Sequence, residues 1–245
     1  MTVEEARGRK SDHVRVQLED LIAQMHPGEP LPAERELAAR IGVARMTLRR
    51  AVDALVAEHR LLRRPGAGTF VAPPRVDQQL SATSFSTDMR SRGMVPGAHT
   101  ALARLRPAGM MLASVLQIRP NAMTLHVRRV RTADGEPMAL EDLHVPADLV
   151  PGLTGDDLED SSFYTLLESR YGLLIASGTQ SVEPHLVTVE EAELLHTQPG
   201  SAAFLFERTS RVQDGRVVEF VRSVYRGDRY RIVVDLNPRN PQTTG

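Results

Sequence analysis

Residues 31–71 read LPAERELAARIGVARMTLRRAVDALVAEHRLLRRPGAGTFV, and this stretch decides the fold of the first part of the chain. It contains two helix-like segments that are separated by Gly42 and Val43. A basic turn at residues 63–68 follows and joins two short strand-like runs. Two helices followed by such a hairpin predict a helix-turn-helix with a β-wing.

The second helix-like segment combines an apolar stripe with a basic start. The stripe has apolar residues at i, i+3, i+4, i+7 and i+8, namely Leu48, Ala51, Val52, Leu55 and Val56. Arg45 and Arg49 lie four residues apart near its start, with Thr47 and Arg50 beside them. A recognition helix presents residues of this kind to base edges and phosphates in the major groove. An amphipathic helix with a solvated basic face is the alternative interpretation.

The hairpin turn favours the DNA-binding interpretation. Gly66 and Gly68 permit positive φ and let the backbone approach a partner closely. Arg63 and Arg64 precede them, and a β-branched and aromatic run that begins at Thr69 follows. A plain hairpin is the alternative, but the position directly after a recognition-type helix indicates a wing.

These motifs resemble the GntR family of bacterial transcription regulators. The patterns LPxERELA, GVxRxTLRRAVxxL and GxGTFV occur in the family's order and spacing. The resemblance implies a homodimer that binds a pseudo-palindromic operator in double-stranded DNA. The candidate DNA-binding residues are Arg35, Arg45, Thr47, Arg49, Arg50, Arg64, Gly66 and Thr69.

Three residues depart from the family pattern. Ala33 and Ala44 each stand where the family usually has serine, so both helices are expected to lack a side-chain cap. Glu36 remains to support the first turn of the first of these helices. His59 stands where a glycine commonly ends the second helix.

Length and composition set the broad class of the protein. The 245 residues suffice for two domains, and the absence of cysteine excludes disulfides and thiolate chemistry. No apolar run approaches the length of a membrane span, and residues 1–10 form no hydrophobic signal segment, so we expect a soluble, cytoplasmic protein. The net charge is −1, yet residues 44–72 hold six arginines against Asp53 and Glu58. Such a local basic element suits a small nucleic-acid footprint.

Signals of catalysis are missing from the sequence. The eight histidines are scattered, and neither a G-x-S-x-G elbow nor a P-loop occurs. We therefore expect no enzyme activity and no cofactor or metal. The alternative, an enzyme or metabolite-binding module with an accessory DNA-binding domain, would be detected by substrate-turnover assays.

Beyond the wing the sequence predicts a linker and a second domain. Prolines and polar residues at 73–80 indicate a linker between a DNA-binding domain at 1–72 and an effector domain at 81–245. Strand-like runs occur at residues 100–106, 123–132, 138–145, 175–182, 203–212, 217–226 and 230–236. Helix-like runs occur at residues 109–116, 162–171 and 188–195. Asp-Gly turns at 134–135 and 214–215 mark hairpins, so we expect an α+β domain around an antiparallel sheet.

Charged residues on two adjoining strands are candidates for ligand binding. Arg129 and Arg131 share one face of a strand, where guanidinium groups suit phosphate or carboxylate. An exposed polar sheet face is the alternative. Glu141 on the next strand could accept hydrogen bonds from ligand hydroxyls, or pair with one of the arginines.

Two serine-containing segments are further candidates. Residues 84–87, SFST, and the pair Ser161 and Ser162 supply hydroxyl and backbone N–H groups at expected helix starts. Helix starts of this kind can bind anions. Simple N-capping is the alternative.

The second domain resembles the UTRA effector-binding domain of the HutC subfamily. The segments SFSTDM, RRVRTADGEPMALE, SSFYTLLE and VRSVYRGDRYRIVVDL carry the resemblance. It implies a chorismate-lyase-like α+β fold that senses a small molecule. The segments are most similar to those of members that sense sugar phosphates and regulate amino-sugar use.

This resemblance also implies roles for individual residues. The two strand arginines would grip the phosphate, the glutamate would bind sugar hydroxyls and a tyrosine would close the pocket. The implied effector-binding residues are Phe85, Ser86, Arg129, Arg131, Glu141, Ser161, Ser162 and Tyr225.

We therefore expect a ligand-responsive transcription regulator, usually a repressor, that is controlled by a small phosphorylated sugar. A regulator that senses a non-sugar ligand, such as an amino-acid derivative or a phosphonate, is the alternative in the same class. Ligand binding would change the spacing of two recognition helices. Because operator half-sites lie about one helical turn apart, a modest change in spacing would prevent both helices from docking.

Overall fold

The computed structural model describes residues 3–72, 75–79 and 84–234. The chain forms two compact units, which divide between Arg75 and Val76. Within the described ranges, no helix is both long enough and apolar enough to cross a membrane.

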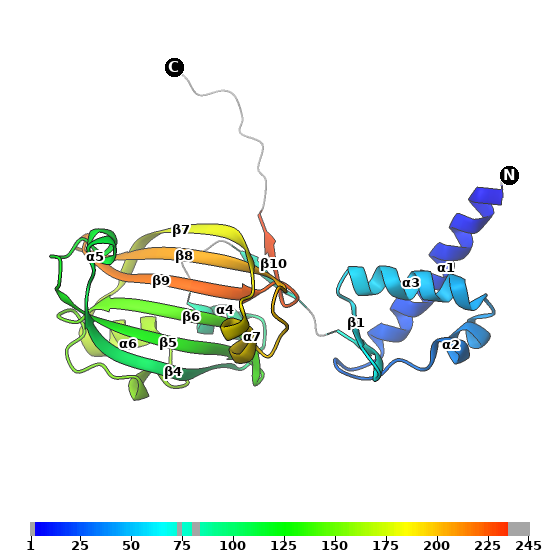
Figure 1. Cartoon of the computed structure of the whole chain (residues 1–245), viewed down its shortest axis with the longest axis horizontal. Helices are drawn as coiled ribbons and strands as arrows, with labels where there is room; N and C mark the ends of the chain where they lie inside the picture. Colours follow the sequence, from blue (N-terminus) through cyan, green and yellow to red (C-terminus); the bar gives the residue numbers. More distant parts are fainter. Residues whose placement is uncertain (1–2, 73–74, 80–83, 235–245) are drawn as a thin grey trace, which may run out of the picture. The chain divides into compact units, whose positions relative to one another are not determined.

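The first unit is a winged helix-turn-helix (Figure 1). Its elements are the helices α1 (Val3–Ala23), α2 (Glu34–Ile41) and α3 (Arg45–Ala57) and the strands β1 (Leu61–Arg64) and β2 (Gly68–Val71). The two strands pair antiparallel, with Leu61 opposite Val71 and Arg64 opposite Gly68. The predicted order of two helices and a wing is confirmed.

An aliphatic core holds this unit together. Val14 and Leu18 of α1 pack with Leu48, Val52 and Leu55, which belong to the predicted stripe of α3, and all five are buried. Burial of such side chains contributes about 1.5–3 kcal/mol each. The stripe therefore turns the opposite, basic side of α3 toward solvent.

The three departures from the family pattern have the expected local consequences. Ala33 and Ala44 occupy the N-cap positions of α2 and α3 without a side-chain cap hydrogen bond. His59 adopts the left-handed conformation at φ 56° that a helix-ending glycine normally takes. The fold tolerates all three.

The second unit is built on an antiparallel sheet, which has six strands within residues 84–234. The strand order is β4-β5-β6-β9-β8-β7. The bounds are β4 Pro96–Pro107, β5 Met123–Ala133, β6 Glu136–Pro146, β7 Ile175–Leu186, β8 Ala202–Val212 and β9 Val217–Arg226. The α+β fold class is thereby confirmed, and the β5–β6 and β8–β9 hairpins turn at the two predicted Asp-Gly sites.

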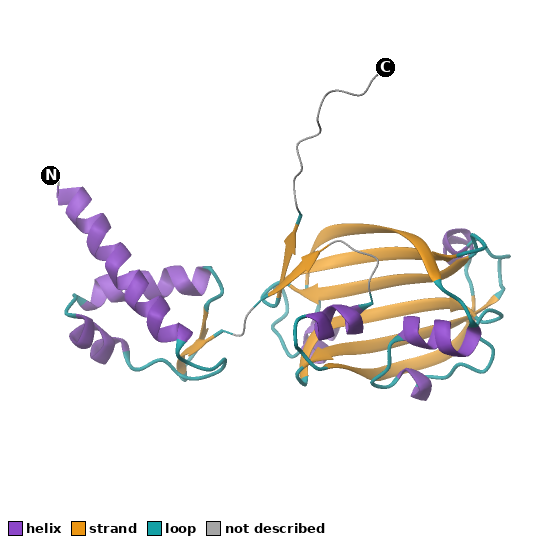
Figure 2. Ribbon diagram, turned by 180° about the vertical axis from the view of Figure 1, so that it is seen from behind, coloured by secondary structure: helices purple, strands orange, loops and turns teal. Residues whose placement is uncertain are grey.

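Helices lie against both faces of this sheet. Helices α5 (Met110–Leu116) and α7 (Val189–Leu195) lie on the near face in Figure 1. Helices α4 (Phe85–Ser91) and α6 (Phe163–Tyr171) lie on the other face, which Figure 2 shows from the front. Because successive strand residues point to opposite faces of a sheet, charged residues that are adjacent in the sequence of β5 or β6 lie on different faces and have different neighbours.

The predicted linker at residues 73–80 needs a correction. Val76–Gln79 form strand β3, which pairs in parallel with β10 (Tyr230–Val233). Asp77 accepts two hydrogen bonds of 2.8 Å from the guanidinium of Arg231. The partner strand lies about 150 residues away along the chain, so the local sequence pattern did not reveal it. Residues 73–74, 80 and 235–236 of the predicted segments lie outside the described ranges.

Candidate functional site

The first candidate surface combines the start of α3 with the wing. Arg45, Arg49 and Arg50 are exposed, and the side chain of Arg45 retains 65% of its accessible surface. Arg64 is also exposed and lies over the ring of Phe70 at 4.7 Å from its centroid. The guanidinium groups are therefore accessible to an anionic partner in solvent.

A groove with a volume of about 450 Å³ lies between α2, α3 and the wing. Five of the candidate residues line it, namely Arg45, Arg49, Arg64, Gly66 and Thr69. Arg35, Thr47 and Arg50 lie outside its lining; the two arginines are exposed and the threonine is half-buried. Gly66 has φ 73° with open space where a Cβ would stand, so the wing tip leaves room for close approach.

The second candidate site is a pocket in the second unit, between the sheet and the starts of α4 and α6. Its cavity volume is about 20 Å³, which is room for about one water molecule, so a larger ligand would have to displace part of the lining. Its lining residues are Ser84, Phe85, Arg129, Arg131, Glu141, Leu143, Ser162, Phe163, Tyr164, Arg208 and Glu219. Five of these residues were expected from the sequence, namely Phe85, Arg129, Arg131, Glu141 and Ser162. The other expected residues, Ser86, Ser161 and Tyr225, lie outside the lining.

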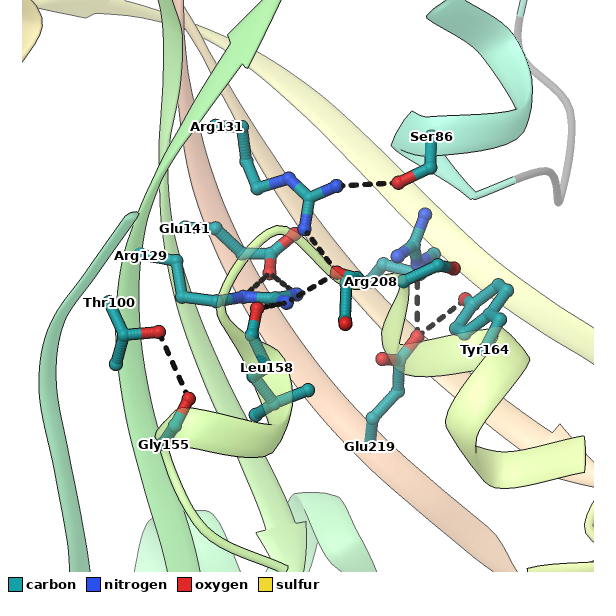
Figure 3. Close-up of polar contacts among 12 residues, drawn as sticks. Ser86, Thr100, Arg129, Arg131, Glu141, Gly155, Leu158, Tyr164, Arg208 and Glu219 are labelled. Carbon is teal, nitrogen blue, oxygen red and sulfur yellow. Dashed lines mark hydrogen bonds and ion pairs between the residues drawn. The ribbon is translucent and has the colours of Figure 1, made fainter. Parts of the chain in front are cut away.

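Arg129 and Glu141 form a buried ion pair in this pocket (Figure 3). They face each other across β5 and β6, and Arg129 Nε donates to Glu141 Oε1 at 3.0 Å. Burial alone would raise the pKa of Glu141, but the charges of Arg129 and Arg131 hold that pKa below its ordinary value. The salt-bridge alternative for Glu141 is thus what the structure shows.

Arg131 is buried with far fewer partners. Its guanidinium donates to Ser86 Oγ at 2.8 Å and to the carbonyl oxygen of Ser161 at 3.3 Å, and it lies over the Phe85 ring. Its Nε has no hydrogen-bond partner in the described structure. Within the described residues the guanidinium of Arg131 also has no carboxylate within 4 Å, since Glu141 pairs with Arg129. Burial first, and then the neighbouring charge of Arg129, lower the pKa of Arg131 from 12.5 to about 10.

The serines contribute differently from one another. Ser84 and Ser162 cap α4 and α6, accepting from the backbone N–H groups of Thr87 and Thr165. N-capping, the alternative weighed for these segments, is therefore observed for both residues. Ser161 lies outside the pocket lining, and its carbonyl oxygen accepts hydrogen bonds from Arg129 and Arg131 of β5.

A second charged group on β8 and β9 was missed by the sequence analysis. Glu219 Oε1 accepts hydrogen bonds from Tyr164 (2.6 Å), Ser210 (2.7 Å) and Arg208 Nε (3.2 Å). Burial alone would lower the pKa of Arg208, but the charge of Glu219 raises it above its ordinary value. The available signal was Glu219 itself, a carboxylate in the middle of the apolar strand VVEFV.

Tyr225 does not line the pocket, contrary to the expectation that it would close it. Its ring packs edge-on against Phe206 and Tyr230, at 4.8 and 4.6 Å between centroids. Burial and the charge of Glu141 raise its pKa to about 12. In this structure Tyr225 belongs to the core behind the pocket.

Comparisons with known proteins agree with both halves of the fold. A model described as bacterial regulatory proteins, gntR family, matches residues 10–71. The UTRA domain model matches residues 91–231, more than half of the chain.

The chain is also similar to individual regulators. It is 40% identical over 211 residues to the HTH-type transcriptional repressor NagR of Bacillus subtilis, covering 86% of each chain. It is 32% identical to the mannosyl-D-glycerate transport/metabolism system repressor MngR of Escherichia coli, covering 91% of this chain and 92% of that one. The crystal structure of PhnF from Mycobacterium smegmatis superposes with a TM-score of 0.65 at 33% identity, covering 91% of this chain and all of that one.

These relatives are named as transcriptional repressors, which agrees with the expectation that the chain is not an enzyme. The matched models also account for a DNA-binding unit and a small-molecule-binding unit in one chain. The chain therefore belongs to the GntR family of bacterial transcription regulators, in the HutC subfamily that joins a winged helix-turn-helix to a UTRA effector domain.

Proposed function

We propose that this repressor binds a pseudo-palindromic operator as a homodimer and is controlled by a small phosphorylated sugar, such as an amino-sugar phosphate. The DNA half of the proposal assigns base and phosphate contacts to the exposed arginines of α3 and the wing. The effector half assigns the ligand to the pocket around Arg129 and Arg131.

Arg131 is the observation that carries the effector half. A buried guanidinium normally has a carboxylate partner, because burying a lone charge is costly. Arg131 instead has two hydrogen bonds and an unpaired Nε in the described structure. An anionic ligand group would supply the missing partner.

The charge of the pocket supports the same ligand class. Its charged lining residues are three arginines, Arg129, Arg131 and Arg208, and two glutamates, Glu141 and Glu219. The described lining therefore has a formal charge of +1, three arginines against two glutamates, and an amino-sugar phosphate, whose ammonium group offsets part of the phosphate charge, would roughly neutralise it. The two carboxylates offer acceptors for hydroxyl or amino groups of the rest of the ligand.

The apolar part of the lining suits the carbon skeleton of a sugar. Leu143, Phe85 and Phe163 contribute side chains that can pack against ring C–H groups. The relative MngR is named for a system that uses mannosyl-D-glycerate, a sugar derivative that bears a carboxylate. An anionic sugar is therefore a consistent choice for this pocket.

A packed route connects the pocket with the segment that follows the DNA-binding unit. Arg131 contacts Ser86 and Phe85 at the start of α4. Met89 of the same helix is buried in one cluster with Val76 and Tyr230, which belong to β3 and β10. A ligand oxygen that competes with Ser86 for Arg131 would therefore shift α4 against β3, which begins directly after Arg75.

A thermal-shift screen tests the effector assignment. The probes are glucosamine 6-phosphate, glucosamine, inorganic phosphate, a 2-aminoethyl phosphonate and a set of amino-acid derivatives. We expect glucosamine 6-phosphate to raise the melting temperature, since a ligand at 100 times its Kd stabilises by about 2.7 kcal/mol. Arg131→Met should abolish this rise.

Arg128→Met provides the matched control. Arg128 precedes Arg129 but lies on the opposite face, where it pairs with Asp142 and Glu190. This variant should lose stability without losing the ligand response. If only the phosphonate or an amino-acid derivative stabilised the protein, the effector would be a non-sugar ligand and not a sugar phosphate. An equal response in the Arg131→Met protein would place the ligand elsewhere.

A further inference from the structure

Glu34, the first residue of α2, faces arginines from two other elements of the winged helix-turn-helix. Its Oε2 lies 3.9 Å from Nε of Arg45, the first residue of the recognition helix α3. Its Oε1 lies 3.6 Å from Nη2 of Arg63 on β1. The Glu34 side chain is 23% exposed, against 65% for Arg45 and 40% for Arg63.

The contact involves only the Nε edge of the Arg45 guanidinium. Glu34 lies beside Nε, while the two terminal nitrogens of Arg45 make no hydrogen bond or ion pair within residues 3–72. A guanidinium reads guanine through two parallel donors that must be aligned with O6 and N7. At 3.9 Å the contact is an electrostatic attraction and not a hydrogen bond, so it favours guanidinium orientations with Nε near Glu34 and leaves the terminal nitrogens available to a base.

Arg63 extends the same network to the wing. It pairs with Glu34 of α2 and also, at 2.8 Å, with Asp53 of α3. Two carboxylates and one guanidinium therefore connect α2, α3 and β1. The wing arginine and the recognition-helix arginine share Glu34 as a common partner.

We propose, on the basis of the operator contacts proposed above for α3 and the wing, that Glu34 is a positioning residue that sets the DNA specificity of this regulator. Acting through Arg45 and Arg63, it aligns the donors that contact the operator. Its negative charge also weakens attraction to phosphates, which dominate non-specific binding. The charge effect applies to specific and non-specific binding alike, so the alignment of the donors is what widens the gap between the two affinities.

A purely helix-stabilising role for Glu34 is the competing explanation. Acidic residues in the first turn of α2 interact favourably with the helix dipole, and this helix has no side-chain cap at Ala33. Glu36 lies in the same turn, is exposed and makes no ion pair within the described DNA-binding unit. Glu36→Gln therefore removes the same charge from the same turn without touching an arginine.

The experiment compares Glu34→Gln and Glu36→Gln in the full-length protein. The specific probe is a duplex selected by the wild-type protein from a random library, and the non-specific probe is its scrambled sequence. Kd values for both are measured by fluorescence anisotropy at several salt concentrations. Loss of folded protein would weaken both affinities in proportion, so their ratio is insensitive to it.

We expect Glu34→Gln to lower the ratio of specific to non-specific affinity about tenfold, the scale of one misaligned bidentate base contact. Glu36→Gln should leave the ratio within about twofold, because charge alone changes both affinities alike. In an Arg45→Ala background, Glu34→Gln should have little further effect on the ratio. Equal ratios for the two glutamine variants, or an undiminished effect without Arg45, would overturn the proposal.

Discussion

Replacing Arg131 with methionine is expected to leave the unliganded protein as stable as the wild type or slightly more stable. Burial lowers the pKa of Arg131 from 12.5 to about 10, which corresponds to about 3 kcal/mol of unfavourable free energy for the buried charge. Methionine removes this cost. It also removes the hydrogen bonds to Ser86 and to the carbonyl of Ser161, at about 1 kcal/mol each.

The balance is a change between zero and about +1 kcal/mol in the free energy of unfolding. For a domain of this size, that is a rise in Tm of at most about 4 °C. Arg129→Met, two residues away, should behave in the opposite way. It leaves the buried Glu141 without its partner, and breaking such a pair costs about 3–5 kcal/mol.

Urea and thermal unfolding of the two variants measure this contrast directly. An unpaired buried charge in a ligand site lowers the stability of the unliganded protein, so its removal should not destabilise the fold. Removal of one partner of a structural ion pair should destabilise it. If Arg131→Met destabilised the protein as strongly as Arg129→Met, Arg131 would be a structural residue. The argument that its charge awaits an anionic ligand would then fail.

Four further predictions concern other parts of the molecule. Arg45→Ala or Arg49→Ala should weaken operator binding at least several-fold and leave ligand-induced thermal shifts unchanged. Unaltered DNA affinity in a folded variant would show that these residues do not contact the operator. Log affinity for operator DNA should fall linearly with log salt, whereas a flat dependence would contradict phosphate contacts. Ala33→Ser should restore the missing cap of α2 and add about 1 kcal/mol of stability in urea titrations, and a loss of stability would show that the cap geometry is wrong. Burial lowers the pKa of His144 from 6.5 to about 4, so between these pH values the folded protein binds fewer protons than the unfolded chain. The free energy of unfolding should therefore fall by up to about 2 kcal/mol as the pH drops through that window. His144→Phe should flatten this part of the pH–stability profile, and an unchanged profile would exclude His144 as its cause.

Local patterns were sufficient to predict most of the fold. The 3.6-residue period of the α3 stripe and the alternation along the strands arise from burial of one face, which a sequence records directly. The Asp-Gly turns at 134–135 and 214–215 fixed the two hairpins, because few residues accept positive φ. Strand β3 escaped prediction because its only described partner, β10, is remote in the chain.

The pocket was harder to predict than the fold. Arg129 and Glu141 are on adjacent strands of one hairpin, so their pairing could be expected from register alone. Arg208 and Tyr164 join the same pocket from elements far apart in sequence, and only tertiary packing brings them to Glu219. Tyr225 was placed in the pocket through family resemblance, but its ring packs into the aromatic core instead.

The most direct test of the account is a titration of the operator complex with glucosamine 6-phosphate. Fluorescence anisotropy would give the Kd of the selected duplex with and without ligand, for the wild type and for Arg131→Met. The account predicts a change of about 5- to 150-fold in the wild type, the usual range of allosteric coupling, and no change in the variant. An equal ligand effect in both proteins, or none in the wild type, would contradict control of DNA binding through the Arg131 pocket.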